Sequence, residues 1–370
     1  MSKYNSLLDY IRWRGDLSFK AFPFNDIDAM ILSQLSSVRY GHAVPGAANV
    51  DELQKRPYKL LPTLEQVAHL HQESFSGENS NSKMEEEDYI LFEAGKSNRF
   101  KDIRMDGYIC DMDSENIKQF SAVTFFLKKR LVYIAFRGTD DTFISWEENF
   151  RMSYMFPIPA QADAEKYLNF MAKGFLRKSI VGGHSKGGNM AVYASTFCKN
   201  TIQKSIQRIF AFDAPGFPKD LNSIESYGLI KDKIVGYMPV NSIIGTLMTV
   251  PYQNLIVNSD ASSVWQHYMF NWEIVGTSPV YVEDRSEFSY RFEKTVSEKI
   301  DAIPEEDKPQ SVSELFSVFR DNQIYKISDF SNMSFKQVLG LIKGARSISS
   351  ANKNLLLSIV KLLWEDSRKK

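Results

Sequence analysis

The chain has 370 residues, with 45 basic and 45 acidic side chains and a formal net charge of zero. Without a positive excess to neutralise phosphates, the composition argues against a dedicated nucleic-acid-binding protein. The apolar fraction of 43% and the aromatic fraction of 13% are typical of globular proteins, which excludes a disordered chain. At roughly 100–200 residues per domain, this length suggests two domains or one large domain with additions.

Cysteine usage and the N-terminus bear on the cellular compartment. Two cysteines, Cys110 and Cys198, are too few for a disulfide framework or a four-ligand zinc site. Residues 1–16 carry charge in every turn, so we predict no secretory signal. No apolar run approaches the roughly 18 residues of a membrane span. We expect a cytoplasmic protein with no cofactor, no metal, no nucleic-acid partner and no transmembrane segment; transient contact with a membrane surface and the oligomeric state stay open.

The N-terminal region is expected to be helical. Apolar residues recur at spacings of three to four in residues 4–36, and Asn25 and Asp26 are candidate helix caps. Residues 73–88 are polar and rich in Ser, Gly and Asn, which predicts a mobile loop. These segments form a helical extension over about residues 1–88.

The periodicity then changes to short β-branched and aromatic runs. Residues 121–127 and 131–136 predict a hairpin, and strands and helices alternate after it. The expected elements are a helix near 161–176, a strand at 178–183, a helix at 186–198 and strands at 208–213, 233–240 and 254–258. The alternation predicts an α/β fold with a mostly parallel central sheet and helices on both faces. We expect one domain over residues 1–370, with its core at about 100–295, an extended segment at 279–293 and helices at 311–370.

A glycine-rich segment supplies the candidate nucleophile. Gly183-His184-Ser185-Lys186-Gly187 matches the pattern G-x-S-x-G between a predicted strand and a predicted helix. Such a turn strains the serine backbone, and the flanking glycines remove Cβ atoms that would clash. We predict Ser185 as the nucleophile and a packing role for His184. The alternative is a glycine-rich turn with an ordinary capping serine.

A serine nucleophile requires a general base and an acid that orients it. Hydrolases with this elbow carry them in the order serine, acid, histidine, and of the five histidines His267 alone follows Ser185. Asp213 ends a predicted strand before a turn-forming Ala-Pro-Gly segment and is the favoured acid, with Asp260 as the alternative. The competing interpretations are a histidine packed among aromatic residues and an aspartate that caps a turn.

Acyl transfer also requires donors for the developing oxyanion. The backbone N–H of Lys186, directly after the nucleophile, is the first expected donor. Thr139, in the segment F-R-G-T-D after the strand at 131–136, is the second. The alternative for Thr139 is a turn that only caps the following segment.

Together these motifs resemble the class 3 lipases, in which F-R-G-T or F-R-G-S supplies the oxyanion residue and a tryptophan follows, here Trp146. Over about residues 4–275 the chain is more closely similar to a bacterial family of uncharacterised lipase-like α/β-hydrolases. The segments that carry this similarity include AFRGTDD, GGHSKGGNMAVYAS, FDAPGF, PVNSIIGTLM and VWQHYMFNW. The resemblance implies an α/β-hydrolase fold, with Ser185, His267 and Thr139 as nucleophile, base and oxyanion residue.

The sequence departs from the class 3 pattern at two positions. Class 3 lipases carry their acid in a later D-P-V-P-like segment, where this chain has Asn241 and Ser242. The segment around Asp213 instead resembles the aspartate-bearing turn of pancreatic-type lipases. Lys186 replaces the usual apolar residue or glutamine, so its side chain is expected either to favour anionic groups at the mouth of the site or to be solvated.

The expected activity is that of a serine hydrolase that cleaves carboxylic esters, lipid esters among them, through an acyl-enzyme. The substrate is a small-molecule or lipid ester. A thioesterase or peptidase on the same fold is an alternative, because a triad determines the type of reaction but does not determine which leaving group is accepted. A non-catalytic interaction protein is the third. Aromatic and methionine residues at 152–158 and 237–248 are candidates for an acyl pocket, although core packing is the more common role.

Overall fold

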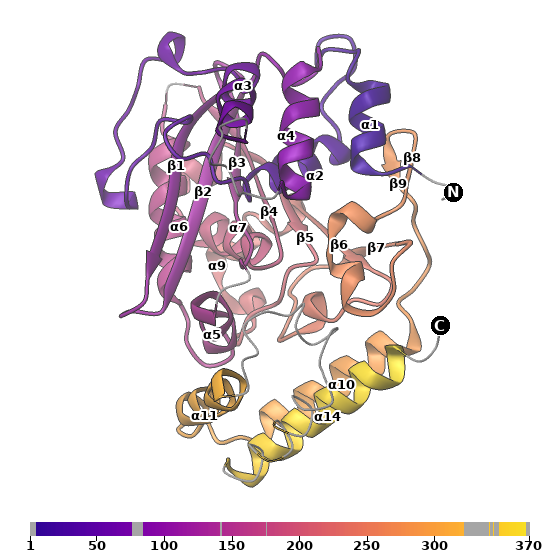
Figure 1. Cartoon of the computed structure of the whole chain (residues 1–370). Helices are drawn as coiled ribbons and strands as arrows, with labels where there is room; N and C mark the ends of the chain where they lie inside the picture. The colour runs from indigo at the N-terminus through magenta and orange to yellow at the C-terminus, as the bar shows by residue number, and fades with distance from the viewer. Residues whose placement is uncertain are drawn as a thin grey trace.

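The computed structural model describes residues 5–75, 84–140, 143–174, 176–321, 340, 343 and 348–367. A seven-stranded sheet in sequential order forms its centre (Figure 1). Three strands pair antiparallel: β1 (Arg104–Asp113), β2 (Lys118–Lys128) and β3 (Leu131–Phe136). From β3 onward the pairing is parallel, through β4 (Lys178–His184), β5 (Ile206–Phe212), β6 (Ile234–Pro239) and β7 (Asn254–Val257). The predicted α/β fold and its hairpin are confirmed.

Helices between the parallel strands cover one face of this sheet. Right-handed connections between neighbouring parallel strands place successive helices on the same side. These helices are α6 (Pro159–Met171), α7 (Lys186–Phe197) and α9 (Glu225–Gly228). Tyr167 of α6 and Met190 of α7 are buried in one apolar core with Phe136 of β3. This face of the sheet therefore packs against the chain that follows β3.

The N-terminal helices cover the opposite face (Figure 1). They are α1 (Leu7–Arg14), α2 (Asp26–Leu35), α3 (Leu64–Phe75) and α4 (Glu86–Lys96). Asn25, one of the two candidate caps, caps α2. Tyr133 of β3 connects the sheet to that helix. Its hydroxyl lies 2.7 Å from Ser33 Oγ and 3.0 Å from the carbonyl oxygen of Ala29. The N-terminal region is therefore one of the two helical layers that enclose the sheet.

Three expectations about local structure need correction. The polar segment 73–88 is a loop only in part, because α3 extends to Phe75 and α4 begins at Glu86; residues 76–83 lie outside the described residues. A capping box joins Glu85 and Asp88 and starts α4 despite the polar composition. Strand β1 had no counterpart among the expected elements. Residues 279–293 are not extended throughout, because α10 (Glu287–Asp301) begins within them.

The signal for α10 was present in the sequence as apolar spacing. Phe288, Phe292 and Val296 recur every four residues and pack in one cluster with Leu362 of α14 (Ser350–Ser367). The helices expected at 311–370 are confirmed for α14 and for α11 (Lys308–Asp321); most of residues 322–349 lie outside the described part. Within the described residues, no helix combines the length and apolar character needed to cross a bilayer.

Candidate active site

Ser185 occupies a strained turn between β4 and α7. Its φ of 58° and ψ of −130° lie in a region that L residues rarely adopt. A Cβ on Gly187 would lie 2.1 Å from the carbonyl oxygen of Phe136, and one on Gly183 would lie 2.4 Å from the Gly187 carbonyl carbon. Both positions therefore require glycine. The turn places Ser185 at the carboxyl end of β4, with 7% of its surface exposed.

Asp213 and His267 meet beside this turn. Asp213 Oδ2 lies 2.6 Å from His267 Nδ1, and the aspartate is fully buried. A carboxylate only accepts hydrogen bonds, so Nδ1 carries a proton, and in the neutral imidazole Nε2 then has the lone pair. Asp260, the alternative acid, is exposed. Among the described residues, Asp213 is the acid whose carboxylate contacts His267.

The second carboxylate oxygen of Asp213 is bound by a loop that follows β6. Ser242 Oγ donates to Asp213 Oδ1 at 2.5 Å, and the Gly245 N–H donates to the same oxygen at 3.1 Å. In the sequence this segment is part of the family resemblance and lacks the carboxylate of the class 3 pattern. The structure shows that its serine instead orients a carboxylate supplied by another strand. No local signal could have revealed this partner, because 29 positions separate the two residues.

A buried glutamine fixes the loop that carries His267. Gln266 Oε1 accepts a hydrogen bond from the Asn241 N–H at 3.0 Å, and its Nε2 donates to the carbonyl oxygen of Ala261 at 2.9 Å. The Trp272 indole donates to the Gln266 carbonyl oxygen at 2.8 Å. These three bonds hold the 3₁₀ turn η6 (Ser263–His267) against the sheet.

His184 packs against His267, in agreement with its expected packing role. The two ring centroids lie 4.4 Å apart, and His184 Nε2 donates to the His267 carbonyl oxygen at 2.7 Å. The contact holds the His267 loop beside the elbow. Among the contacts of the described residues, none is a hydrogen bond from the Ser185 hydroxyl to His267. Such bonds are often long or poorly aligned before substrate binds.

The environment of His184 makes folding sensitive to pH. Removal from water lowers the pKa of His184 well below its usual range, and the neighbouring His267 lowers it further. The unfolded chain takes up a proton near pH 6.5, about the usual histidine value, whereas the folded chain does not. Folding stability therefore falls as the pH drops below about 6.5.

We expect His184→Gln to remove this dependence while the amide replaces the Nε2 donor. The free energy of unfolding, measured by urea denaturation from pH 8 to pH 5, should fall more steeply for the natural protein. The difference in slope should be at most about 1.4 kcal/mol per pH unit. Parallel pH profiles would contradict a neutral His184 in the folded protein.

The segment after β3 lies directly against the elbow. A Cβ on Gly138 would lie 2.8 Å from the His184 carbonyl oxygen and 3.3 Å from Ser185 Cβ. Thr139 follows, and Asn149 Nδ2 donates to its Oγ1 at 2.6 Å. Because the threonine oxygen accepts this bond, its hydroxyl proton remains available for another acceptor. The side chain of Trp146 lies outside the described residues.

The expectations for the Lys186 side chain were wrong. It neither faces the mouth of the site nor is solvated, since it is fully buried. Its Nζ lies 2.7 Å from Glu148 Oε2 and 2.9 Å from the carbonyl oxygen of Gln119. Glu148, in α5 (Phe143–Arg151), also accepts from the N–H groups of Gln119 and Ala160. The first turn of α7 directs the lysine inward, so only its backbone N–H can serve the site.

The side chains expected to line an acyl pocket belong mainly to the core. Met152 is buried, and Met155 and Phe156 pack against the same apolar cluster. Tyr237 is fully buried in the core on the opposite face of the sheet. These positions agree with core packing, the more common role of such side chains.

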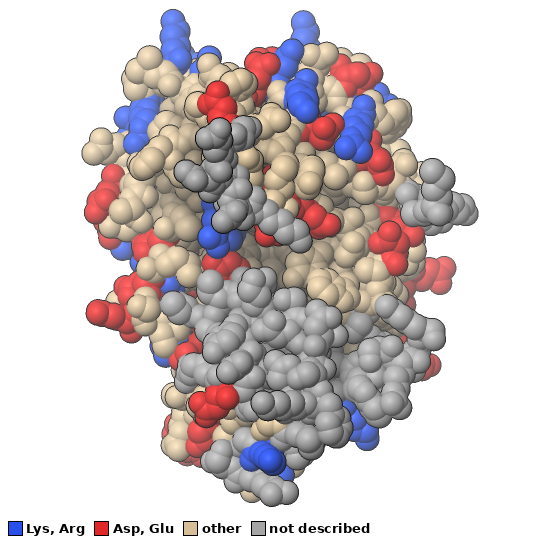
Figure 2. Space-filling view, viewed as in Figure 1, with Lys and Arg blue, Asp and Glu red and all other residues tan. Residues whose placement is uncertain are grey.

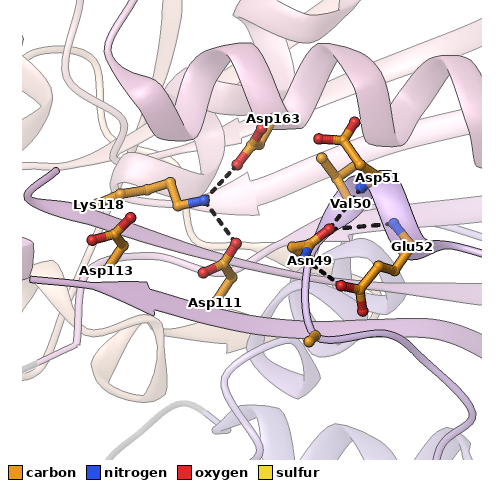
Figure 3. A pocket seen from close by; sticks show the side chains of 9 residues that line it. Asn49, Val50, Asp51, Glu52, Asp111, Asp113, Lys118 and Asp163 are labelled. Atoms are coloured by element: carbon orange, nitrogen blue, oxygen red, sulfur yellow. Dashed lines mark hydrogen bonds and ion pairs between the residues drawn. The ribbon is translucent and has the colours of Figure 1, made fainter. Parts of the chain in front are cut away.

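A separate pocket of about 540 Å³ is lined by several acidic side chains (Figure 3). Lys118 Nζ lies between two of them, 2.7 Å from Asp111 Oδ2 and 3.0 Å from Asp163 Oδ2. The pocket therefore contains its own counter-charge and none of the predicted catalytic residues. Across the described part of the chain, no group of three or more His, Cys, Asp or Glu side chains is arranged to hold a metal ion.

Fold and site together define an α/β protein with a serine elbow at the carboxyl end of a parallel strand. The chain belongs to the Mbeg1-like family, whose sequence profile matches residues 94–317, a range that contains all five predicted site residues. A solved structure titled "Crystal structure of M37 lipase" is similar at 12% identity and a TM-score of 0.31, over 59% of this chain and 68% of that one. A likeness of this strength indicates nothing about activity. No curated protein matches the chain.

Proposed function

We propose that this protein is a serine hydrolase that cleaves carboxylic esters through an acyl-enzyme. Ser185 is the nucleophile, His267 the general base and Asp213 the acid. The observation that carries the proposal is the 2.6 Å contact between Asp213 Oδ2 and His267 Nδ1 beside the strained serine turn. A strained serine next to a histidine oriented by a buried carboxylate is the arrangement that activates a hydroxyl for attack.

The reaction follows from the protonation states of these groups. His267 Nε2 takes the Ser185 hydroxyl proton as Oγ attacks the ester carbonyl carbon, and Asp213 stabilises the resulting imidazolium. The tetrahedral intermediate collapses, the alcohol leaves with the proton from Nε2, and the acyl group stays on Oγ. Water then attacks the acyl-enzyme by the same proton transfers, which releases the acid and restores Ser185.

Two groups are the proposed donors to the oxyanion of each intermediate. The Lys186 N–H lies in the first turn of α7, where backbone N–H groups have no partner within the helix. Thr139 supplies its backbone N–H and the hydroxyl that Asn149 orients. Each donor of this kind typically contributes a factor of about 10²–10³ in rate.

The proposed substrate is a small-molecule or lipid ester in the cytoplasm. Both cysteines are free, as in proteins of reducing compartments. On the face shown in Figure 2, basic and acidic side chains are interspersed over the upper part of the surface. That distribution fits a neutral chain whose substrate is selected by local contacts, with little long-range steering by net charge.

Labelling with a fluorophosphonate probe tests the proposal. We expect the probe to modify the folded protein, and peptide mapping by mass spectrometry should place the adduct on Ser185. Ser185→Ala is the matched control, because it removes one oxygen atom and should abolish labelling. Absence of labelling in the folded natural protein would refute the proposed activity, and an adduct on another residue would refute the site.

A further inference from the structure

One cation beside the elbow has no assigned role. Arg137 lies between the end of β3 and Gly138, and only 8% of its surface is exposed. Its backbone N–H donates to the Ser121 carbonyl oxygen at 2.9 Å. In the described part of the chain, its guanidinium forms no hydrogen bond or ion pair with another side chain. Removing most of a charged side chain from water without an ion-pair partner is costly, and this favours binding of an anion at such a group.

Strand register places Arg137 beside His184. Phe136 of β3 pairs with Gly183 of β4, so the next residues of the two strands are neighbours. Side chains alternate along a strand, and Phe136 packs in the core shared with α6 and α7. Arg137 therefore projects from the other face of the sheet, the face on which the His184 ring contacts His267. Adjacent strands lie about 4.8 Å apart, so the backbone of Arg137 lies one strand away from His184, whose ring contacts the base.

Nearby titratable groups compensate this charge only in part. Burial raises the pKa of Glu87 to about 7, and the opposing influence of Arg137 is smaller. Burial also raises the pKa of Tyr108, and Arg137 again acts in the opposite direction. Both groups therefore lie within electrostatic reach of the guanidinium. Glu87 is about half protonated near pH 7, so at that pH it offsets only part of the positive charge.

We propose that Arg137 binds an anionic group of the substrate, a carboxylate or a phosphate, close to the ester that Ser185 attacks. The inference deepens the proposed function and rests on it. A guanidinium presents paired N–H donors that match carboxylate and phosphate oxygens, and these charge-assisted bonds are strong when water is excluded. The buried pair of Lys186 with Glu148 excludes that lysine as the residue that binds an anion at the site, which leaves Arg137 for this role. The substrate class is thus an ester with a negative charge near the scissile bond.

Two substrate pairs test this inference and distinguish the two anions. The first compares 4-nitrophenyl hydrogen adipate with neutral 4-nitrophenyl hexanoate, and the second compares a lysophosphatidate with the monoacylglycerol of the same acyl chain. We expect the natural protein to have a higher kcat/KM for the anionic member of at least one pair. Arg137→Gln should lower that kcat/KM by about 10- to 100-fold and leave the neutral substrate within about 2-fold. Arg137→Lys should recover part of the loss.

Controls separate this inference from the proposed function. Arg12→Gln removes an exposed arginine that pairs with Glu93 and should change neither substrate. Fluorophosphonate labelling without any preference for anionic substrates, or an equal loss for both members of a pair in Arg137→Gln, would overturn the anion site. If the natural protein is not labelled by the fluorophosphonate and hydrolyses none of these esters, the proposed function fails instead. Calorimetric titration with inorganic phosphate and with adipate then tests the anion site independently of hydrolysis. Weaker binding by Arg137→Gln than by the natural protein supports the site. Equal binding by the two proteins, or no binding by either, overturns it.

Discussion

Asp213→Asn is expected to lower turnover by about four orders of magnitude, the loss typical of an asparagine in place of a triad acid. Asp213 accepts a hydrogen bond from His267 Nδ1 at 2.6 Å, so loss of the carboxylate allows the imidazole to adopt the wrong tautomer. An asparagine keeps the shape of the side chain and can still accept a bond from Ser242. The variant should therefore fold, and kcat for 4-nitrophenyl esters, with thermal unfolding as a folding check, measures the effect.

Asp260→Asn is the matched control for this substitution. Its carboxylate is exposed, and its backbone N–H donates to the carbonyl oxygen of Asn271. We expect turnover within about 2-fold of the natural protein, because surface changes of this kind have small effects. A larger loss in Asp260→Asn than in Asp213→Asn would transfer the role of the acid to Asp260.

Lys186→Met is expected to destabilise the folded protein by about 3–5 kcal/mol. The lysine and Glu148 are both fully buried and lie 2.7 Å apart, so the substitution leaves a carboxylate buried without its cation. Glu148 also accepts hydrogen bonds from the backbone N–H groups of Gln119 and Ala160. These bonds anchor β2 and α6 around the carboxylate. The free energy of unfolding from urea denaturation measures the loss.

A double substitution distinguishes the lost ion pair from lost packing. Lys186→Met with Glu148→Leu removes both charges, and replacement of a buried pair by apolar residues is often close to neutral. The double variant should therefore be more stable than Lys186→Met alone. Lys294→Met is the control, because its pair with Glu298 is exposed and should contribute at most about 1 kcal/mol. A double variant no more stable than the single one would contradict the buried-pair argument.

Several features of the site followed directly from local sequence. The glycines around Ser185 predicted its turn because a Cβ at either position would overlap backbone atoms. The chain order of serine, acid and histidine selected His267, and the strand end before Ala-Pro-Gly selected Asp213. The structure brings these last two residues into contact. The site assignment stays a prediction until labelling and turnover are measured.

Other features depended on residues far apart in the chain. The inward direction of Lys186 could not be predicted, because the partner Glu148 belongs to another helix. The same holds for Ser242, whose hydroxyl reaches Asp213 across a separate loop. Neither residue carries a pattern that distinguishes it from an ordinary surface side chain.

The sequence by itself determined the neutral charge, the alternation that makes an α/β sheet, and the serine elbow, because each depends on composition or near neighbours. The tertiary structure decided that the N-terminal helices form a layer over the sheet and that the Lys186 side chain forms a buried ion pair with Glu148. It also placed Arg137 beside His184. Strand register and helix packing bring such residues together, and neither can be read from a local pattern.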